Sequence, residues 1–268
     1  MQTPMMIGAE TVAPDTISLT SYAPVADLGA LPVNAFVIKA AQPILVDTGL
    51  ASLREPFLKA LSSSIDPGDL RWIWLSHMDA DHLGNLDAVL ALAPQATVIT
   101  NVLGMAKLAL RGFDLTRVHL LPPGARIDAG DRELVPLKPA YYDAPETIGF
   151  FDTRTRVLFC ADAFGTLMQE PAPEAAAIGP QALVDGMITW AAIDAPWLGM
   201  IDRTAFGREL GAIERLDPSA IISGHLPVAR NVTRRLTGCL DRALAAGQIA
   251  APDHAEIERL FKGDCAAA

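Results

Sequence analysis

Short apolar runs alternate with amphipathic stretches along most of the chain, and this alternation is the first structural signal in the sequence. Apolar runs of about four to eight residues between turn-forming residues are typical of buried strands, whereas apolar residues three and four apart indicate helices. Strands that alternate with helices favour an α/β fold over a helix bundle or an all-β sandwich. The predicted strands cover residues 34–40, 43–46, 71–75, 96–100, 133–137, 147–152, 156–160 and 220–223, and the predicted helices cover residues 53–61, 83–92, 102–110, 203–216, 232–246 and 252–262.

One part of the chain interrupts the pattern. Residues 165–201 contain Pro171, Pro173, Pro180 and Pro196, and we predict an irregular segment there because proline breaks helices and strands. The helices predicted after residue 230 follow the last strand and are expected to pack on the rest of the chain. The predicted organisation is an N-terminal extension at residues 1–17, a main domain at residues 18–230 and a helical C-terminal segment at residues 231–268.

The charge balance limits the kinds of partner. The chain has 21 Lys and Arg residues against 31 Asp and Glu residues, which gives a formal net charge of -10 at pH 7. Binding to nucleic acid depends on clustered basic side chains, so we expect no nucleic-acid partner. Hydrophobic residues make up 51% of the chain, which is enough to bury a sizeable core.

The cysteines and the N-terminal residues indicate the cellular compartment to expect. Cys160, Cys239 and Cys265 are far apart and form no C-x-x-C pair, which argues against a disulfide framework and against a cysteine zinc site. The first residues lack the basic and apolar regions of a signal peptide, and no apolar run approaches the roughly 18 residues of a membrane span. We therefore expect a cytoplasmic protein with no membrane partner.

The most informative segment follows the strand predicted at residues 71–75. Residues 76–84 (SHMDADHLG) place four potential metal ligands, His77, Asp79, Asp81 and His82, within six residues. Extended chain projects His77 and Asp79 to one side, and the turn into the next helix brings Asp81 and His82 to the same volume. A helix-capping turn would account for one aspartate but not for the other three side chains, so the segment favours a metal site.

This segment resembles the H-x-H-x-D-H signature of the metallo-β-lactamase superfamily, with Asp79 where most members have the second histidine. The resemblance covers about residues 18–230 and implies a four-layer αββα sandwich, here with extra C-terminal helices. Three further runs are similar to motifs of that superfamily and stand in the same order along the chain, namely residues 45–49 (LVDTG), 157–165 (VLFCADAFG) and 221–225 (IISGH).

The turn before Pro145 departs from the superfamily pattern, because Asp143 stands where most members have a histidine. Residues 142–146 (YDAPE) are most similar to flavodiiron proteins, a branch with an H-x-E-x-D-H signature and a W-P-E-like turn. The C-D-A-F-G run of that branch is also similar to residues 160–165 (CADAFG). The local resemblance is therefore to the di-iron domain of flavodiiron proteins.

The resemblance implies one or two divalent metal ions. A carboxylate-rich site without sulfur favours iron or manganese, and zinc also fits. Aspartate reaches less far from the backbone than histidine or glutamate, so Asp79 and Asp143 leave it open whether the first ion binds or a water takes its place. By position, the first ion would have His77, Asp79, Asp143 and Asp162 as ligands, and the second would have Asp81, His82, Asp162 and His225.

The superfamily resemblance implies a metal-dependent hydrolase that directs a metal-bound hydroxide at a small ester-like substrate, such as a lactone, a thioester or a phosphate or sulfate ester. Asp81 would orient the hydroxide, and Tyr142 or its neighbour Tyr141 would protonate the leaving group. The first alternative is a di-iron oxidoreductase, or a sensor of oxygen or nitric oxide, that takes electrons from a separate donor. The second is a scaffold with a degenerate metal site. A homodimer is compatible with each.

Other residues have weaker signals. Asp47 ends the predicted strand at residues 43–46 and is expected either to orient a ligand imidazole or to form a simple turn. Trp190 and Trp197 are expected either at the wall of a substrate pocket or at a dimer interface. His119 and His254 match no position of the superfamily and are expected to be structural or surface residues.

Overall fold

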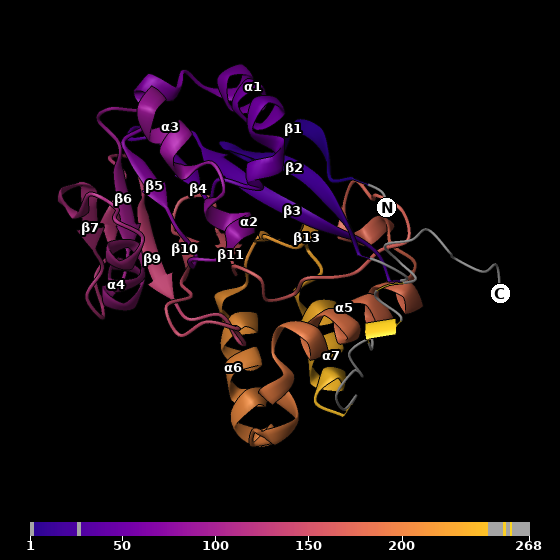
Figure 1. Ribbon diagram of the computed structural model, residues 1–268. Coiled ribbons are helices and arrows are strands. Elements are labelled where there is room, and N and C mark those ends of the chain that lie inside the picture. Colours follow the sequence, from indigo (N-terminus) through magenta and orange to yellow (C-terminus); the bar gives the residue numbers. More distant parts are fainter. Residues whose placement is uncertain (1–2, 26–27, 246–253, 256–257, 259–268) are drawn as a thin grey trace.

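Two β-sheets stacked face to face form the centre of the protein, and helices cover both outer faces (Figure 1). The structure is a computed structural model that describes residues 3–25, 28–245, 254–255 and 258. Three buried apolar clusters separate the layers, one between the sheets and one beneath each set of helices. This arrangement confirms the four-layer αββα sandwich that the sequence predicts.

The first sheet has seven strands in chain order. The strands from β1 to β4 pair antiparallel, and those from β4 to β7 pair parallel. The strands are β1 (Met5–Ala13), β2 (Thr16–Val25), β3 (Gly29–Ile38), β4 (Ile44–Val46), β5 (Trp72–Trp74), β6 (Thr97–Thr100) and β7 (Val118–Leu120). Because β4 and β5 run parallel, the loops that follow them leave the same edge of the sheet.

The second sheet has six strands in the order β13-β12-β11-β10-β9-β8. Only β11 and β12 pair parallel in it, so the chain segments that follow these two strands also leave one edge together. The strands are β8 (Ile127–Asp128), β9 (Glu133–Leu137), β10 (Gly149–Asp152), β11 (Val157–Phe159), β12 (Ala220–Ser223) and β13 (Leu226–Arg230).

The helices divide between the two outer faces. Apolar residues of α1, α3 and α4 pack on the first sheet, whereas those of α5, α6 and α7 pack on the second. Among the described residues, none of the helices has both the length and the apolar character that a membrane crossing requires. The α-helices are α1 (Arg54–Ser64), α2 (Ala80–Leu83), α3 (Leu86–Leu92), α4 (Val102–Leu110), α5 (Pro180–Asp194), α6 (Arg203–Leu216) and α7 (Thr233–Ala243), and short 3-10 helices lie at Ala51–Leu53, Pro67–Asp69, Leu115–Arg117, Ala175–Ala177 and Pro196–Met200.

The structure differs from the sequence predictions in several places. The strands β2, β7, β8 and β13 were not among those predicted. The segment predicted to be irregular contains α5, which has 15 residues. Pro180 occupies the first turn of this helix, where a missing N–H group costs no hydrogen bond, and Pro196 follows its end. Residues 5–13, which we placed in an N-terminal extension, form β1 at the edge of the first sheet.

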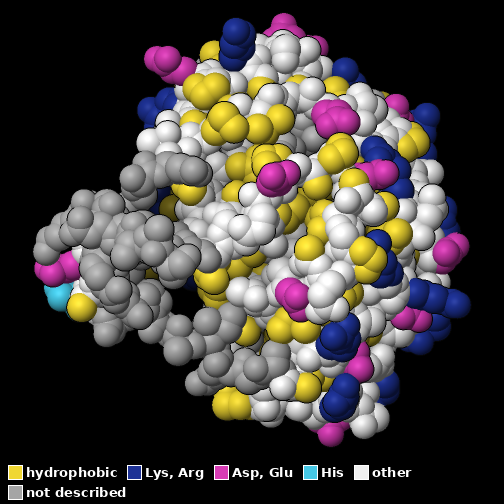
Figure 2. Space-filling model, turned by 90° about the vertical axis from the view of Figure 1, so that its right-hand side faces the viewer, with side chains coloured by type: hydrophobic (Ala, Val, Ile, Leu, Met, Phe, Trp, Pro, Cys, Tyr) yellow, Lys and Arg dark blue, Asp and Glu magenta, His cyan; other side chains and the backbone are white. Residues whose placement is uncertain are grey.

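The division of the chain into three parts stays a prediction. The helix predicted at residues 252–262 lies largely outside the described residues, and so does the end of the helix predicted at residues 232–246. Figure 2 shows one face of the molecule, on which basic and acidic side chains are interspersed rather than gathered into separate patches.

A buried arginine joins the two sheets at one end. The Arg132 side chain is fully buried before β9 and donates to Asp15, in the turn between β1 and β2, at 2.9 Å. It also donates to Asp152 at the end of β10 at 3.2 Å and to the neighbouring Asp131 at 2.9 Å. These carboxylates raise the pKa of Arg132 further above its usual range, although burial alone would lower it. The cluster offsets the cost of burying the charge and fixes the relative position of the sheets.

We expect Arg132→Met to lower the free energy of unfolding by about 3–5 kcal/mol, because it leaves the Asp152 carboxylate buried without its partner. Arg126→Met is the matched control, since Arg126 and Glu133 form an exposed ion pair and its loss should cost less than about 1 kcal/mol. Urea unfolding followed by circular dichroism measures both values. Equal losses in the two variants would contradict the structural role of Arg132.

Candidate metal centre

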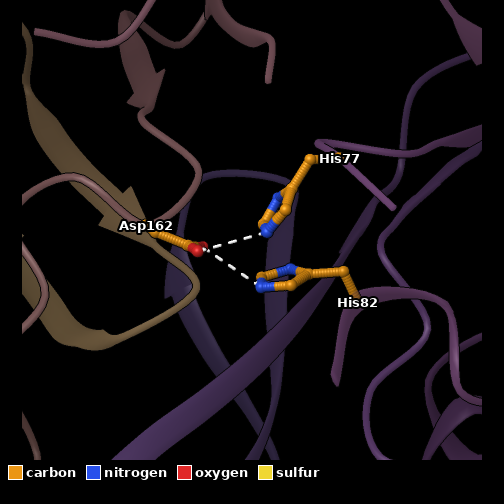
Figure 3. A group of neighbouring side chains, drawn as sticks. All are labelled: His77, His82 and Asp162. Carbon is orange, nitrogen blue, oxygen red and sulfur yellow. Dashed lines mark ion pairs between the residues drawn. The ribbon is translucent and has the colours of Figure 1, made fainter. Parts of the chain in front are cut away.

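The site lies where the two sheets present the ends of their parallel strand pairs to each other. His77 and His82 follow β5 in the first sheet, and they point toward Asp162 across the gap between the sheets (Figure 3). Asp162 follows β11, and His225 follows β12 in the second sheet. The parallel pairing of β11 with β12 brings Asp162 and His225 to one edge, although 62 residues separate them in the sequence.

Asp47 fixes the orientation of the His82 ring. Its Oδ1 atom accepts a hydrogen bond from the backbone N–H of Ser76 at 2.8 Å, and its Oδ2 atom accepts from the Ser76 hydroxyl group at 2.8 Å. The same Oδ2 atom lies 2.9 Å from Nδ1 of His82. A proton held on Nδ1 by this carboxylate leaves Nε2 free to bind a cation. This contact matches the orienting role that the sequence indicated for Asp47.

The imidazole rings of His77 and His225 are also oriented by a contact at Nδ1. Nδ1 of His225 lies 2.8 Å from the Pro32 carbonyl oxygen and donates to it, while Nδ1 of His77 lies 3.0 Å from the Ser76 hydroxyl group. Each Nε2 atom therefore faces Asp162, at 3.3 Å for His77 and 3.5 Å for His225. Nε2 of His82 lies 3.1 Å from Oδ1 of Asp162, so three imidazole rings converge on one carboxylate.

Several of these atoms have no hydrogen-bond partner. Nε2 of His77, Nε2 of His82 and Oδ1 of Asp162 are buried, and none makes a hydrogen bond to a described residue. Leaving such groups buried without partners costs about 1–3 kcal/mol each. Because three imidazole nitrogens converge on the single Asp162 carboxylate, these atoms have the arrangement of ligands around a cation. The donor set of imidazole nitrogens and carboxylate oxygens therefore fits a metal centre.

Six of the seven predicted ligands fall into two groups, and Asp162 links these groups. Asp162 lies between the groups, because its carboxylate approaches Nε2 of both His77 and His82. Within each group, one ligand atom from every residue lies within 4.8 Å of the others. The first group is His77, Asp79 and Asp143, the second is Asp81, His82 and His225, and a third group of His77, His82 and Asp162 joins them. The role of these residues as ligands stays a prediction, which their placement supports.

The helix-capping alternative does not account for Asp79. Asp79 occupies the N-cap position of α2, yet its side chain accepts no capping hydrogen bond. Asp143 lies 4.0 Å from Nε2 of His77 through its Oδ1 atom, and its side chain is 24% exposed. The turn that carries Asp143 is held by Lys138, which donates to the Pro145 carbonyl oxygen at 2.6 Å. Both aspartates are therefore free to bind a cation.

The carboxylates change the protonation of the imidazole rings. Burial, the largest single effect, lowers the pKa of His225, but Asp162 and Asp81 together raise it to about 9. The pKa of His82 is also raised well above its usual value, because Asp162, Asp81 and Asp47 outweigh its burial. The imidazole rings hold the pKa of Asp162 well below its usual value in spite of burial. Without a metal ion, protons take the place of cations in this cluster.

One residue near the site was missed by the sequence analysis. Asp194, at the end of α5, groups with Asp143 and Asp162. Burial raises the pKa of Asp194 to about 7, and the carboxylates of Asp162 and Asp143 add to the rise. Burial also raises the pKa of Tyr141 well above its usual value, and Asp194 adds to that rise. No sequence signal identified Asp194, because its segment was predicted to be irregular.

The remaining predicted residues lie around the centre. The ring of Tyr142 packs against that of Trp197 at 5.7 Å and beneath Nζ of Lys138 at 4.0 Å, and its catalytic role stays a prediction. Trp190 donates to the backbone oxygen of Asp162 at 3.2 Å. His119 lies away from the site against Trp72, as expected for a structural residue.

Gly224 allows the two sheets to approach each other at the site. A Cβ atom at this position would lie 2.8 Å from Cε1 of His82 and 3.1 Å from Oδ1 of Asp162. Contacts this short force the imidazole ring or the carboxylate to move. The run of residues 221–225 therefore needs glycine before its histidine for steric reasons.

Comparison with known proteins identifies the relatives of this chain. The family model described as the metallo-beta-lactamase superfamily matches residues 28–225. Diflavin flavoprotein A 1 of Synechocystis sp. is 30% identical over 141 residues, which cover 49% of this chain. The match covers 23% of that relative, so the matched half of this chain corresponds to less than a quarter of the relative's length.

Solved structures of the same fold carry related names. Rubredoxin oxygen:oxidoreductase from Desulfovibrio gigas superposes with a TM-score of 0.75 at 19% identity, covering 88% of this chain and 61% of that one. The metal-soaked Flv1 flavodiiron core from Synechocystis sp. superposes with a TM-score of 0.74 at 19% identity, covering 91% and 62%. At these identities the likeness shows the fold. Together with the family model, the matches confirm the superfamily resemblance and the local likeness to flavodiiron proteins.

We expect Gly224→Ala to weaken metal binding by about tenfold or more, because the new methyl group displaces His82 or Asp162. Gly207→Ala on α6 is the matched control, since a Cβ atom there meets nothing within 4 Å. Titration of chelator-treated protein with Mn²⁺ measures the affinity, and circular dichroism checks the fold. Unchanged affinity in a folded Gly224→Ala protein would show that the close approach is not needed.

The raised histidine pKa values predict a pH dependence for chelator-treated protein. A folded-state pKa of about 9 for His225, against about 6.5 in the unfolded chain, stabilises the fold fully below pH 6.5. This contribution is lost as the pH rises through 9, so the melting temperature should fall over that range. His225→Gln should flatten the dependence. A wild-type melting temperature that is constant or rises between these pH values would contradict the protonated cluster.

Proposed function

The chain belongs to the metallo-beta-lactamase superfamily, and from this membership we propose that it forms the di-iron domain of an oxidoreductase that reduces dioxygen. The observation that carries the proposal is the pair of ligand groups that Asp162 links through its contacts with His77 and His82, with buried Nε2 and Oδ1 atoms that have no hydrogen-bond partner. The relatives named diflavin flavoprotein and rubredoxin oxygen:oxidoreductase support redox chemistry.

The ligand set supports iron. Four aspartates and three histidines without sulfur suit a hard or intermediate ion, and manganese and zinc are the alternatives. When bound, the ions would supply electron transfer to dioxygen, which takes up four electrons and four protons to give two molecules of water. The first ion would be held by His77, Asp79, Asp143 and Asp162, and the second by Asp81, His82, Asp162 and His225.

The protein's own groups orient the ligands and supply hydrogen-bond donors. Asp47 and the Pro32 carbonyl oxygen hold the His82 and His225 rings with Nε2 toward Asp162. Tyr141 is fully buried, and burial raises its pKa, so it stays a phenol that can donate a hydrogen bond near Asp162 and Asp194. This position favours Tyr141 over Tyr142 as the tyrosine that acts at the site.

The proposal implies an electron donor and leaves the assembly open to test. A reduced flavin or an iron-sulfur protein, in another domain or another chain, would deliver the electrons. The possible homodimer and the cytoplasmic location remain part of the proposal, and the free thiols of Cys160 and Cys239 support a reducing compartment. The hydrolase interpretation has less support, because the named relatives are flavoproteins and an oxidoreductase.

The test combines metal analysis with two activity assays on the full chain purified without a metal-chelating tag. We expect about two iron ions per chain, and oxygen uptake when anaerobically reduced protein meets oxygenated buffer. His82→Ala and His225→Ala should each lose metal and oxygen uptake, whereas His119→Ala should keep both.

A panel of carboxylic, thioester and phosphodiester substrates serves as the competing assay. Turnover of an ester without oxygen uptake would replace the proposal with a hydrolase. Protein that binds no metal even after anaerobic reconstitution would exclude both reactions and leave the scaffold interpretation.

A further inference from the structure

Asp194 brings a carboxylate to the metal centre from an element that carries none of the superfamily motifs. It is the last residue of α5, the helix that packs on the outer face of the second sheet (Figure 1). Trp190, one turn earlier on the same helix, donates to the backbone oxygen of Asp162 at 3.2 Å and packs its ring against His225 at 4.6 Å. Residues four apart lie on one helix face, so α5 directs this face at the centre.

The Asp194 carboxylate lies close to two of the predicted metal ligands, Asp143 and Asp162. One oxygen each of Asp143, Asp162 and Asp194 lies within 4.8 Å of the others. Oδ2 of Asp194 is buried and makes no hydrogen bond to a described residue. In the same volume, Nε2 of His77, whose side chain is fully buried, also has no hydrogen-bond partner. Asp194 on α5 and His77 after β5 therefore each direct a polar atom without a hydrogen-bond partner toward the Asp143 and Asp162 carboxylates.

The surroundings of Asp194 disfavour an ionised carboxylate at this position unless a cation binds to it. Within the described part of the chain, no lysine or arginine forms an ion pair with Asp143, Asp162 or Asp194. Asp194 also sits at the C-terminal end of α5, where the helix dipole is negative and an acidic side chain is unfavourable. The helix end is closed by the Ala195 N–H group, which donates to the Ala191 carbonyl oxygen, so Asp194 has no capping role there.

We infer that Asp194 is an additional ligand of the first metal ion, beside His77, Asp79, Asp143 and Asp162. The inference rests on the proposed metal centre and assigns a residue that the superfamily motifs do not include. It also explains how the first site can work with two short aspartates. A carboxylate that arrives from α5 adds an oxygen on the side of Asp143 and Asp162.

The test is a titration of chelator-treated full-length protein with Mn²⁺, in which free Mn²⁺ is followed by electron paramagnetic resonance. The wild-type protein should bind about two ions per chain. Asp194→Ala and the isosteric Asp194→Asn should each weaken one of the two sites by about tenfold or more and leave the other unchanged. The spin-coupled signal of a manganese pair should be lost with the weakened site.

Controls separate this inference from the proposed function. Asp185→Asn removes an exposed carboxylate from the same helix, which bonds only Gln181 among the described side chains, and it should bind like the wild type. His225→Ala should weaken the second site, whereas the Asp194 variants should weaken the first. Circular dichroism of each chelator-treated variant checks folding. If Asp194→Ala does not fold, the result for Asp194→Asn decides the test.

The outcomes are distinct. Wild-type affinity at both sites in a folded Asp194→Ala or Asp194→Asn protein would overturn the ligand role and leave the di-iron proposal intact. Both sites intact together with a slower oxygen uptake would instead identify Asp194 as a proton donor and overturn the inference in the same way. A wild-type protein that binds neither Mn²⁺ nor Fe²⁺ would overturn the proposed function and the inference together.

Discussion

Asp162 is a buried carboxylate that faces three imidazole rings. Burying these ionisable groups together, away from water, costs free energy, and the site depends on how the structure offsets this cost. The surrounding structure keeps them from separating. Asp47 and the Pro32 carbonyl oxygen fix two of the rings through their Nδ1 atoms. The turn around Asp162 holds Ala161 and Phe164 at φ angles of 48° and 69°, which are uncommon for residues other than glycine. A fold that accepts such strain at one position must gain stability elsewhere, and the three apolar clusters supply it.

The sequence was sufficient to predict the parts of the site that depend on local order. Four ligands from His77 to His82 lie within a run of six residues, and a strand followed by a helix brings such residues close together. The contact between Asp47 and His82 could also be predicted, because a polar residue at the end of a parallel strand faces the loop after the next strand. The alternation of strands and helices predicted the α/β class, and the resemblance to the metallo-β-lactamase superfamily implied the four-layer arrangement.

The sequence was not sufficient where long-range packing decides the structure. The prolines around α5 gave the same signal as a loop, and only the packing of Leu183 and Met187 on the second sheet makes the helix the favoured conformation. The position of Asp194 depends on where this helix ends in space, which no spacing in the sequence records. The strand β1 was missed because its pattern of exposed residues is that of an edge, with one face toward solvent.

The parallel pairing of β11 with β12 has a consequence for the order in which the centre can be assembled. A ribosome that has synthesised the chain as far as Asp162 has already released the run from His77 to His82, but His225 follows 63 residues later, after α5 and α6. The nascent chain therefore contains six of the seven predicted ligands well before the last one, His225, exists. Since β12 must dock beside β11 before His225 reaches its place, the centre cannot be completed until these two strands of the second sheet have paired.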